Sequence, residues 1–221
     1  MEVKQILKKN DFLKLSARAP LRIGLAGGGT DIKSYFDFYS GATLNAAINK
    51  YAYAEITNIK SNFVAQAADH ATEMSIDDIE NTTKIPKELR LHFAVYKRII
   101  EDFNKSKHLK IKLSTFCDAP IGSGLGSSST LVVAILKAFD DLLDLKFDKY
   151  FIAELAYKIE REDCQFSGGK QDQYSASFGG FNFIKFYKEK TIVESLNIEN
   201  FFKCELETSL ILHFTGLSRL S

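Results

Sequence analysis

Alternation of apolar and polar residues predicts two long strands near the N-terminus. Residues 17–26 and 42–57 both follow a period of two, which is typical of strands with one buried face. Residues 63–74 are expected to form a further strand that pairs with 42–57, and residues 35–39 a short helix or turn. The same pattern predicts later strands at 109–116, 181–186 and 204–215.

Three other segments have the spacing of helices. Behind Pro86, apolar residues recur at spacings of four and three from Leu89 to Phe103, which predicts a helix with one buried stripe. Residues 131–145 are apolar nearly all round, so we expect a fully buried helix. Residues 149–163 predict a third helix that ends in the sequence ERED. Because a helix C-terminus disfavours negative charge, we expect a positive group to offset this acidic cluster.

Two segments carry no such pattern. Residues 75–84 are polar and acidic and are expected to form a surface loop, and residues 194–200 favour no particular element.

The composition indicates a folded domain whose net charge does not attract nucleic acid or an anionic membrane. In 221 residues, 45% hydrophobic content is enough for a buried core, and 29 basic against 28 acidic residues leave a formal charge of +1. We therefore expect neither a nucleic-acid nor a membrane partner. Three widely spaced cysteines, Cys117, Cys164 and Cys204, predict free thiols and a cytoplasmic location, and no segment has the length of a membrane span.

The main chemical signal is a loop rich in glycine and serine, which reads CDAPIGSGLGSSST from Cys117 to Thr130. Its glycines allow close backbone approach, and the hydroxyls of the serines at 127–129 and the free N–H groups of the next helix are expected to point at one place. This predicts an anion site, with a plain tight turn as the alternative. A P-loop lysine and the third glycine of a dinucleotide fingerprint are both missing, because Ser127 stands at both positions.

Two further glycine clusters accompany this loop. The first predicted strand runs into the sequence GGGTD at 27–31, which is expected to be a ligand-facing turn or a plain hairpin turn. The other cluster reads GGKQDQY at 168–174. Together the three supply a phosphate cradle, oxygen ligands for a metal and a polar turn for an acceptor, which are the parts that phosphoryl transfer needs. The histidines at 70, 92, 108 and 213 lack metal-ligand spacing and are expected to be core or surface residues.

In order and spacing these motifs resemble the GHMP kinase family. The resemblance rests on APLR at 19–22 with GGGTD at 27–31, on the loop from Pro120 to Ser129 and on GGKQDQY at 168–174, and it covers about residues 15–220. It implies an α+β fold in which a mixed, largely antiparallel sheet packs on helices, as in the N-terminal domain of these kinases and the ribosomal protein S5 domain 2-like fold.

The resemblance also implies ATP and Mg²⁺ as cofactors. Ser128 matches the hydroxyl that reaches Mg²⁺, and Glu160 matches the carboxylate metal ligand, with Glu162 as its rival. Mg²⁺ near Glu160 would neutralise the acidic cluster, and a solvated helix end is the alternative for both glutamates. The residues implied to hold the ATP phosphates are Pro120, Gly122, Ser123, Gly124, Leu125, Gly126, Ser127, Ser128 and Ser129.

The remaining implied residues concern catalysis and the acceptor. Asp172 matches the family's candidate base, acting on the acceptor proton or mainly by orientation, and Arg22 would lie beside it and offset charge on the transferred phosphoryl group. The sugar-binding residues are implied to be Gly28, Gly29, Thr30, Asp31 and Gly169. For Lys170 we expect either a contact with a phosphate already on the substrate or a surface position.

The implied function is ATP-dependent phosphorylation of a small-molecule sugar or sugar phosphate. Within the family, the motifs are nearest to kinases that act on the anomeric hydroxyl of D-glycero-D-manno-heptose 7-phosphate in nucleotide-heptose synthesis. A galactose or fucose kinase, or an inactive nucleotide- or sugar-binding fragment, is the alternative.

The resemblance further implies a division of the chain. We expect an N-terminal arm at 1–15, the ATP and substrate domain at 16–200, and at 201–221 the start of a C-terminal domain. Family members carry a third glycine-rich motif in that domain, which nothing after Ser177 supplies. We expect either a truncated or interrupted copy, or a remainder that lies outside this sequence.

Overall fold

The computed structural model describes residues 13–79, 85–120, 122–211 and 213. The strands in these ranges are β1 (Lys14–Ala26), β2 (Gly41–Asn58), β3 (Val64–Ala67), β4 (Thr72–Ser75), β5 (Ile111–Cys117), β6 (Phe181–Phe186) and β7 (Thr191–Leu196). The helices are α2 (Lys33–Tyr39), α3 (Ile76–Ile79), α4 (Arg90–Phe103), α5 (Ser127–Leu143), α6 (Lys149–Lys158), α7 (Gln171–Phe178) and α8 (Asn200–Ser209).

The seven strands form one sheet that is organised around β2. The order is β4-β3-β5-β2-β6-β7, with β1 also paired to β2. Residues 44–57 of β2 pair with β1, while residues 41–46 pair with β6 and 52–58 with β5 on the opposite edge. Only β3 and β5 run parallel among these pairs, so the expected mixed, largely antiparallel sheet is confirmed.

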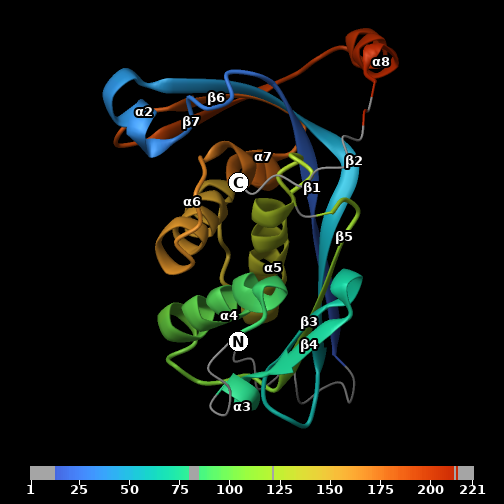
Figure 1. Ribbon diagram of the computed structural model, residues 1–221, viewed down its shortest axis with the longest axis vertical. Helices are drawn as coiled ribbons and strands as arrows, with labels where there is room; N and C mark the ends of the chain where they lie inside the picture. The colour runs from blue at the N-terminus through green and yellow to red at the C-terminus, as the bar shows by residue number, and fades with distance from the viewer. Residues whose placement is uncertain (1–12, 80–84, 121, 212, 214–221) are drawn as a thin grey trace.

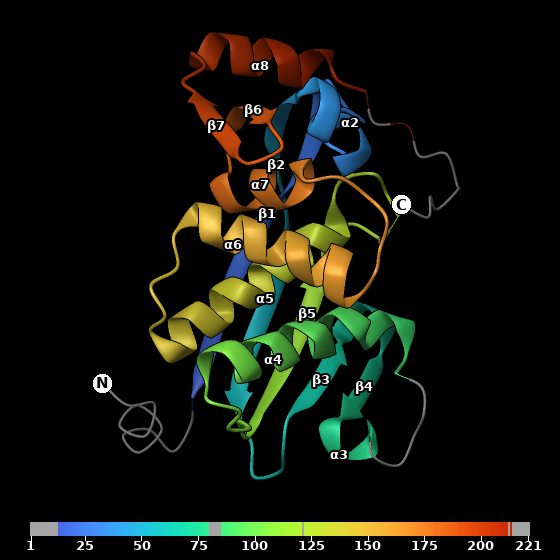
Figure 2. The ribbon, with the colours of Figure 1, turned by 90° about the vertical axis from the view of Figure 1, so that its left-hand side faces the viewer.

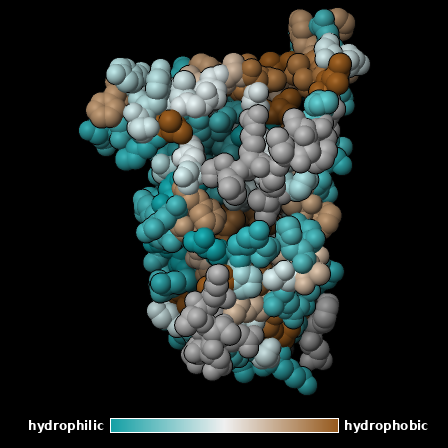
Figure 3. Space-filling model, in the orientation of Figure 1, coloured by the Kyte–Doolittle hydropathy of each residue, from teal (hydrophilic) through white to brown (hydrophobic). Residues whose placement is uncertain are grey.

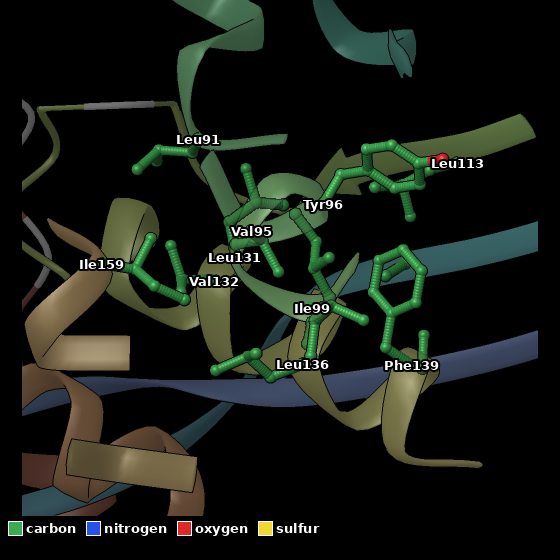
Figure 4. Packing of buried hydrophobic residues seen from close by; sticks show 14 of the residues in the cluster. Leu91, Val95, Tyr96, Ile99, Leu113, Leu131, Val132, Leu136, Phe139 and Ile159 are labelled. Carbon is green, nitrogen blue, oxygen red and sulfur yellow. The ribbon is translucent and has the colours of Figure 1, made fainter. Parts of the chain in front are cut away.

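The helices α4, α5, α6 and α7 stack along one face of this sheet (Figures 1 and 2). As expected, α5 is buried nearly all round, and residues 132–136 within it are completely enclosed. Figure 4 shows how Leu131 and Leu136 of α5 interdigitate with Val95 and Ile99 of α4. Tyr96 of α4 stacks on Phe63, with 3.7 Å between ring centroids. This apolar layer packs α5 between α4 and the sheet.

Two strand predictions are wrong. Residues 63–74 do not pair with β2, because a 3₁₀ turn at Ala68–His70 and the left-handed Ala71 divide them into the hairpin β3–β4, and β5 lies between that hairpin and β2. In the predicted strand at 204–215, residues 204–209 belong to α8 instead, since good helix formers such as Lys203, Glu205 and Leu206 precede the apolar run at 210–212. Residues 212, 214 and 215 lie outside the described residues.

Other boundaries differ by smaller amounts. The unassigned stretch at 194–200 contains the end of β7, which pairs with β6 over its whole length. In the loop expected at 75–84, residues 76–79 form α3, and residues 80–84 lie outside the described residues. Within the expected arm at 1–15, β1 already begins at Lys14, and residues 1–12 are outside the described ranges.

Figure 3 shows hydrophobic surface along the upper edge of the molecule, leading towards α8. The helix α8 buries none of its residues, and Phe201 and Phe202 are 70% and 55% exposed. Of the helices in the described ranges, none is both long and apolar enough to cross a membrane.

Candidate active site

The centre of the site is an ion pair between β1 and α7. The Arg22 Nε donates a hydrogen bond of 2.6 Å to Asp172 Oδ1, and the Arg22 Nη2 pairs with the same oxygen. The Arg22 Nη1 also donates to the carbonyl of Gly124, at 3.0 Å, in the glycine loop. The sequence therefore placed Arg22 beside Asp172 correctly, and the arginine ties both strand and helix to the loop.

The second interacting pair of the site is Ser128 and Glu160. The Ser128 hydroxyl, near the start of α5, donates to Glu160 Oε1 at 3.1 Å, and the Gln173 amide donates to the other carboxylate oxygen. Glu160 is 1% exposed, and burial raises the pKa of its carboxyl, an effect opposed by the charge of Arg161 and by these hydrogen bonds. Glu162, the rival metal ligand, is exposed.

A change of helical winding brings Glu160 to this place. The helix α6 continues into a π-helical turn at Ile159–Asp163, in which the N–H of Cys164 donates to the carbonyl of Ile159, five residues back. Such turns occur frequently at functional sites. The positive group expected beside the acidic cluster is Arg98 of α4, whose Nε donates to Asp163 at 3.0 Å.

The sequence had suggested that the three serine hydroxyls point at one place. This prediction is wrong. Ser127 donates to the carbonyl of Pro120 at 3.4 Å, Ser128 bonds Glu160, and Ser129 accepts from Gln173 at 3.0 Å. The reason is geometric, because successive residues of an α-helix are turned by about 100° from one another. Of the three residues, Ser127 and Ser129 are buried, whereas Ser128 is partly exposed.

The glycines of the loop are required by the conformation of its backbone. Gly122, Gly124 and Gly126 all have φ near +80°, in the left-handed region that favours glycine. Gly126, the residue before α5, also lies against Asp172, since a Cβ there would be 3.1 Å from the carboxyl carbon. The loop thus brings the N-terminus of α5 to the Arg22–Asp172 pair.

The turn at 27–31 docks the start of α7. Asp31 is 2% exposed, and its carboxylate accepts hydrogen bonds from the backbone N–H groups of Gly29 at 3.2 Å and Gln171 at 3.0 Å. Gly169 must be glycine, because a Cβ would come within 1.9 Å of the Asp31 carboxylate. The Thr30 hydroxyl donates to Gly27 and accepts from Ala42. Apart from the adjacent residues, no described atom lies within 4 Å of a Cβ on Gly28 or Gly29.

Lys170 is not a free surface lysine. Its Nζ pairs with Glu154 Oε2 at 3.0 Å and lies 4.7 Å from the ring centre of Tyr157. The adjoining loop is shaped by Arg161, whose guanidinium donates to the carbonyls of Phe166, Ser167 and Gly169. The contact of Lys170 with a substrate phosphate stays a prediction.

Ser128 and Glu160 fit a magnesium ion only in combination with phosphates. Within the described ranges, no group of three or more histidine, cysteine, aspartate or glutamate residues is arranged to hold a metal. One carboxylate and one hydroxyl suit Mg²⁺, which keeps several waters and takes further oxygens from nucleotide phosphates. Ser128 and Glu160 could therefore supply two oxygen ligands to such an ion.

Other groups lie away from this site. A cavity of about 790 Å³ lies beside α4, is bounded by Phe93, Tyr96, Ile100 and Asp163, and includes none of the residues of the glycine loop. The cysteines are free, as expected. His92 is buried beside Thr115, and His70 is a surface residue, also as expected.

Comparison with known proteins shows which proteins the chain resembles. A family model described as the GHMP kinases N terminal domain matches residues 90–180. A D-glycero-alpha-D-manno-heptose 7-phosphate kinase of Campylobacter jejuni is 46% identical over 208 residues, which are 93% of this chain and 60% of that protein. A galactokinase of Pyrococcus furiosus is 27% identical over 206 residues, or 93% of this chain and 54% of its own length.

Solved structures agree with these relatives. A D-glycero-D-manno-heptose 1-phosphate kinase from Bacteriodes thetaiotaomicron has a TM-score of 0.79 at 44% identity, over 89% of this chain and 64% of that one. The mevalonate kinase of Methanococcus jannaschii has a TM-score of 0.67 at 17% identity over 85% of this chain and 57% of that one, a likeness of fold alone. The chain thus spans about 60% of the length of the Campylobacter relative. The chain therefore contains a GHMP kinases N terminal domain, matched over residues 90–180.

Proposed function

We propose that the chain provides the catalytic half of an ATP-dependent sugar kinase. The observation that carries this proposal is the contact of Arg22 with both Asp172 and the glycine loop, because it joins a carboxylate suited to an acceptor hydroxyl to a cradle suited to phosphates. The acceptor that we propose is D-glycero-D-manno-heptose 7-phosphate, phosphorylated at its anomeric hydroxyl. Its support is the 46% identity to a kinase named for that substrate.

In this reaction Asp172 orients the acceptor hydroxyl and accepts its proton as the oxygen attacks the terminal phosphorus of ATP. The bond between that phosphorus and the bridging oxygen breaks, and ADP leaves. Arg22 holds the carboxylate in position and offsets charge on the transferred phosphoryl group. The backbone N–H groups of residues 122–129 bind the ATP phosphates at the N-terminus of α5, where the helix dipole favours negative charge.

Ser128 and Glu160 would hold Mg²⁺, which when bound neutralises phosphate charge and orients the phosphates. Within the protein, Ser128 and Glu160 also have contacts that do not depend on Mg²⁺. Ser128 fixes the Glu160 carboxylate towards the loop, and Gln173 holds the carboxylate from its other side.

The experiment measures ADP release with Mg·ATP and a panel of acceptors: heptose 7-phosphate, heptose 1-phosphate, galactose and fucose. The panel includes both heptose phosphates because the two heptose kinase relatives are named for different ones. Turnover of heptose 7-phosphate at the highest kcat/KM supports the proposal. Preference for galactose or fucose favours the alternative acceptors, and nucleotide binding without any turnover indicates an inactive binding module.

Lys170 provides a second criterion. If it contacts the phosphate of the acceptor, Lys170→Ala raises the KM for heptose 7-phosphate more than that for galactose. Because Lys170 also pairs with Glu154, a general loss of stability is expected in the same variant. The ratio of the two KM values removes that general effect.

We also propose that residues 16–200 are the nucleotide and substrate domain and that residues 201–221 begin a second domain. The exposed aromatic residues of α8 and the greater length of the relatives support this division. A cytoplasmic location is proposed from the free thiols and the use of ATP. Limited proteolysis tests the boundary, with first cleavage expected between β7 and α8.

A further inference from the structure

A row of four paired residues crosses the strands β1, β2, β6 and β7 and ends close to Arg22. In the strand register, Gly24 of β1 is opposite Asn45 of β2, Asn45 is opposite Asn182 of β6, and Asn182 is opposite Ser195 of β7. Directly paired residues of antiparallel strands point to the same face, so the four share one face of the sheet. Asn45 and Asn182 are 0% and 1% exposed, whereas Gly24 is exposed.

The two asparagines differ in how their amides are satisfied. Asn182 donates to the carbonyl of Gly179 at 2.8 Å and accepts from the Ser195 hydroxyl at 2.9 Å. Asn45 donates to the Thr43 hydroxyl at 2.8 Å, but its Oδ1 has no hydrogen-bond partner among the described atoms. A buried acceptor without a partner is costly, and such a group usually has a reason in water or a ligand.

The free oxygen of Asn45 is directed at the space over Gly24. The position that a Cβ of Gly24 would take is 3.7 Å from Asn45 Oδ1, 3.7 Å from Gln171 Oε1 and 3.7 Å from Arg22 Nη1. The Gln171 amide nitrogen donates to Asp31 at 3.3 Å, and that of Asn45 to Thr43, so both side chains present their oxygen to this space. Arg22 connects the space to Asp172.

We propose that Asn45 and Gln171, across the vacant side-chain position of Gly24, bind hydroxyl groups of the acceptor, and that Asn45 is a specificity-determining residue. Two fixed acceptor oxygens require donors, which the hydroxyls of a polyol supply. They disfavour an isolated anion at this position, because phosphate and carboxylate oxygens cannot donate. The proposal rests on the proposed sugar kinase function and names where its acceptor binds.

The test substitutes Gly24 by alanine. Gly24 has no left-handed backbone, and the added methyl would make ordinary contacts at 3.7 Å, so we expect the fold and Tm to be unchanged. The methyl would collide with a hydroxyl that packs against the Gly24 Cα. We expect the KM for heptose 7-phosphate to rise about tenfold or more, while kcat and the KM for ATP stay within about twofold.

A matched pair of asparagine variants separates recognition from structure. Asn45→Ala removes the free oxygen, and Asn182→Ala removes an equally buried amide whose partners all belong to the protein. Both variants are expected to lower Tm, but only Asn45→Ala raises the acceptor KM. Equal acceptor KM values for Asn182→Ala and Asn45→Ala would overturn the proposal.

Calorimetric titration of heptose 7-phosphate without ATP tests the acceptor site separately from the proposed kinase function. If the chain turns over no sugar but binds heptose 7-phosphate, the proposed function fails, and a Kd weakened about tenfold in Gly24→Ala still supports the acceptor site. Turnover with unchanged KM and Kd in Gly24→Ala overturns the inference and leaves the function intact. Absence of binding in the unaltered chain overturns the acceptor site as well.

Discussion

Asp172 and Gln173 are consecutive residues whose side chains contact opposite sides of the site. The Asp172 carboxylate pairs with Arg22 of β1, whereas the Gln173 amide donates to Glu160 and Ser129. The first turn of α7 therefore joins the Arg22–Asp172 pair to the Ser128–Glu160 pair. Any rotation of α7 about its axis displaces both groups together.

Asp172→Asn is expected to lower kcat by about 100-fold or more, because the amide cannot accept the acceptor proton. Its volume is nearly unchanged, so the Kd for ADP should stay within about twofold. Coupled measurement of ADP release and calorimetry check both values. The control is Asp141→Asn, an exposed aspartate on α5. Retention of more than about a tenth of the activity by Asp172→Asn would falsify the role of Asp172 as a base. Its contribution would then be orientation of the acceptor.

Glu160→Gln is expected to raise the Mg²⁺ concentration for half-maximal activity by at least about tenfold, since loss of even an outer partner of a metal site has that effect. The glutamine keeps the volume and can still accept from Ser128. Magnesium titrations of the initial rate provide the measurement. Glu162→Gln, two residues away and exposed, is the control. If both variants shift the titration equally, Glu160 is not the metal ligand.

Gly126→Ala and Gly124→Ala form a matched pair for the loop. Both residues have φ near +80°, so each alanine should cost about 1 kcal/mol of unfolding free energy from backbone strain alone. Only the Cβ at position 126 meets Asp172, at 3.1 Å from its carboxyl carbon, which should cost about 1 kcal/mol more. Urea unfolding measures both. Adding Asp172→Ala to Gly126→Ala should remove the extra loss; if it does not, the contact is not its cause.

His92 makes stability depend on pH. Burial lowers its pKa to about 4, so between pH 6.5 and 4 the unfolded chain binds a proton that the folded chain does not. Stability therefore falls as the pH falls through this range, by about 3 kcal/mol at pH 4, and is unaffected by His92 above pH 6.5. Urea unfolding of His92→Gln should lack this part of the loss. His70→Gln, at an exposed position, should retain it; a pH dependence identical in both variants contradicts the assignment.

The sequence predicted those elements whose periodicity was long and unmixed. The strands β1 and β2 and the helices α4 and α5 each bury one continuous set of apolar side chains, so their patterns follow their own geometry. Short elements depend on their neighbours instead. Residues 64–67 and 72–75 became strands through pairing with β5 and with each other, which local alternation does not specify. The helix α8 buries no residue, so no buried face guided its assignment.

For the site, motifs predicted which residues approach one another but not the direction of each side chain. Arg22 with Asp172 and Ser128 with Glu160 lie together as expected. Asn45 and Gln173 were missed. For Asn45, the available signal was a polar residue at an inward position of a strand. For Gln173, it was a polar residue next to the proposed base. Both depend on which face packs inward, a property of the assembled sheet and helices.

The π-helical turn at Ile159–Asp163 makes the position of Glu160 depend on the number of residues before it. A wider turn accommodates one more residue than an α-helical turn, and each residue of an α-helix rotates the following side chains by about 100°. Loss of a single codon within α6 would therefore leave the composition almost unaltered and still direct a different side chain at Ser128. Insertions and deletions in this helix should consequently be far less tolerated than substitutions on its exposed side.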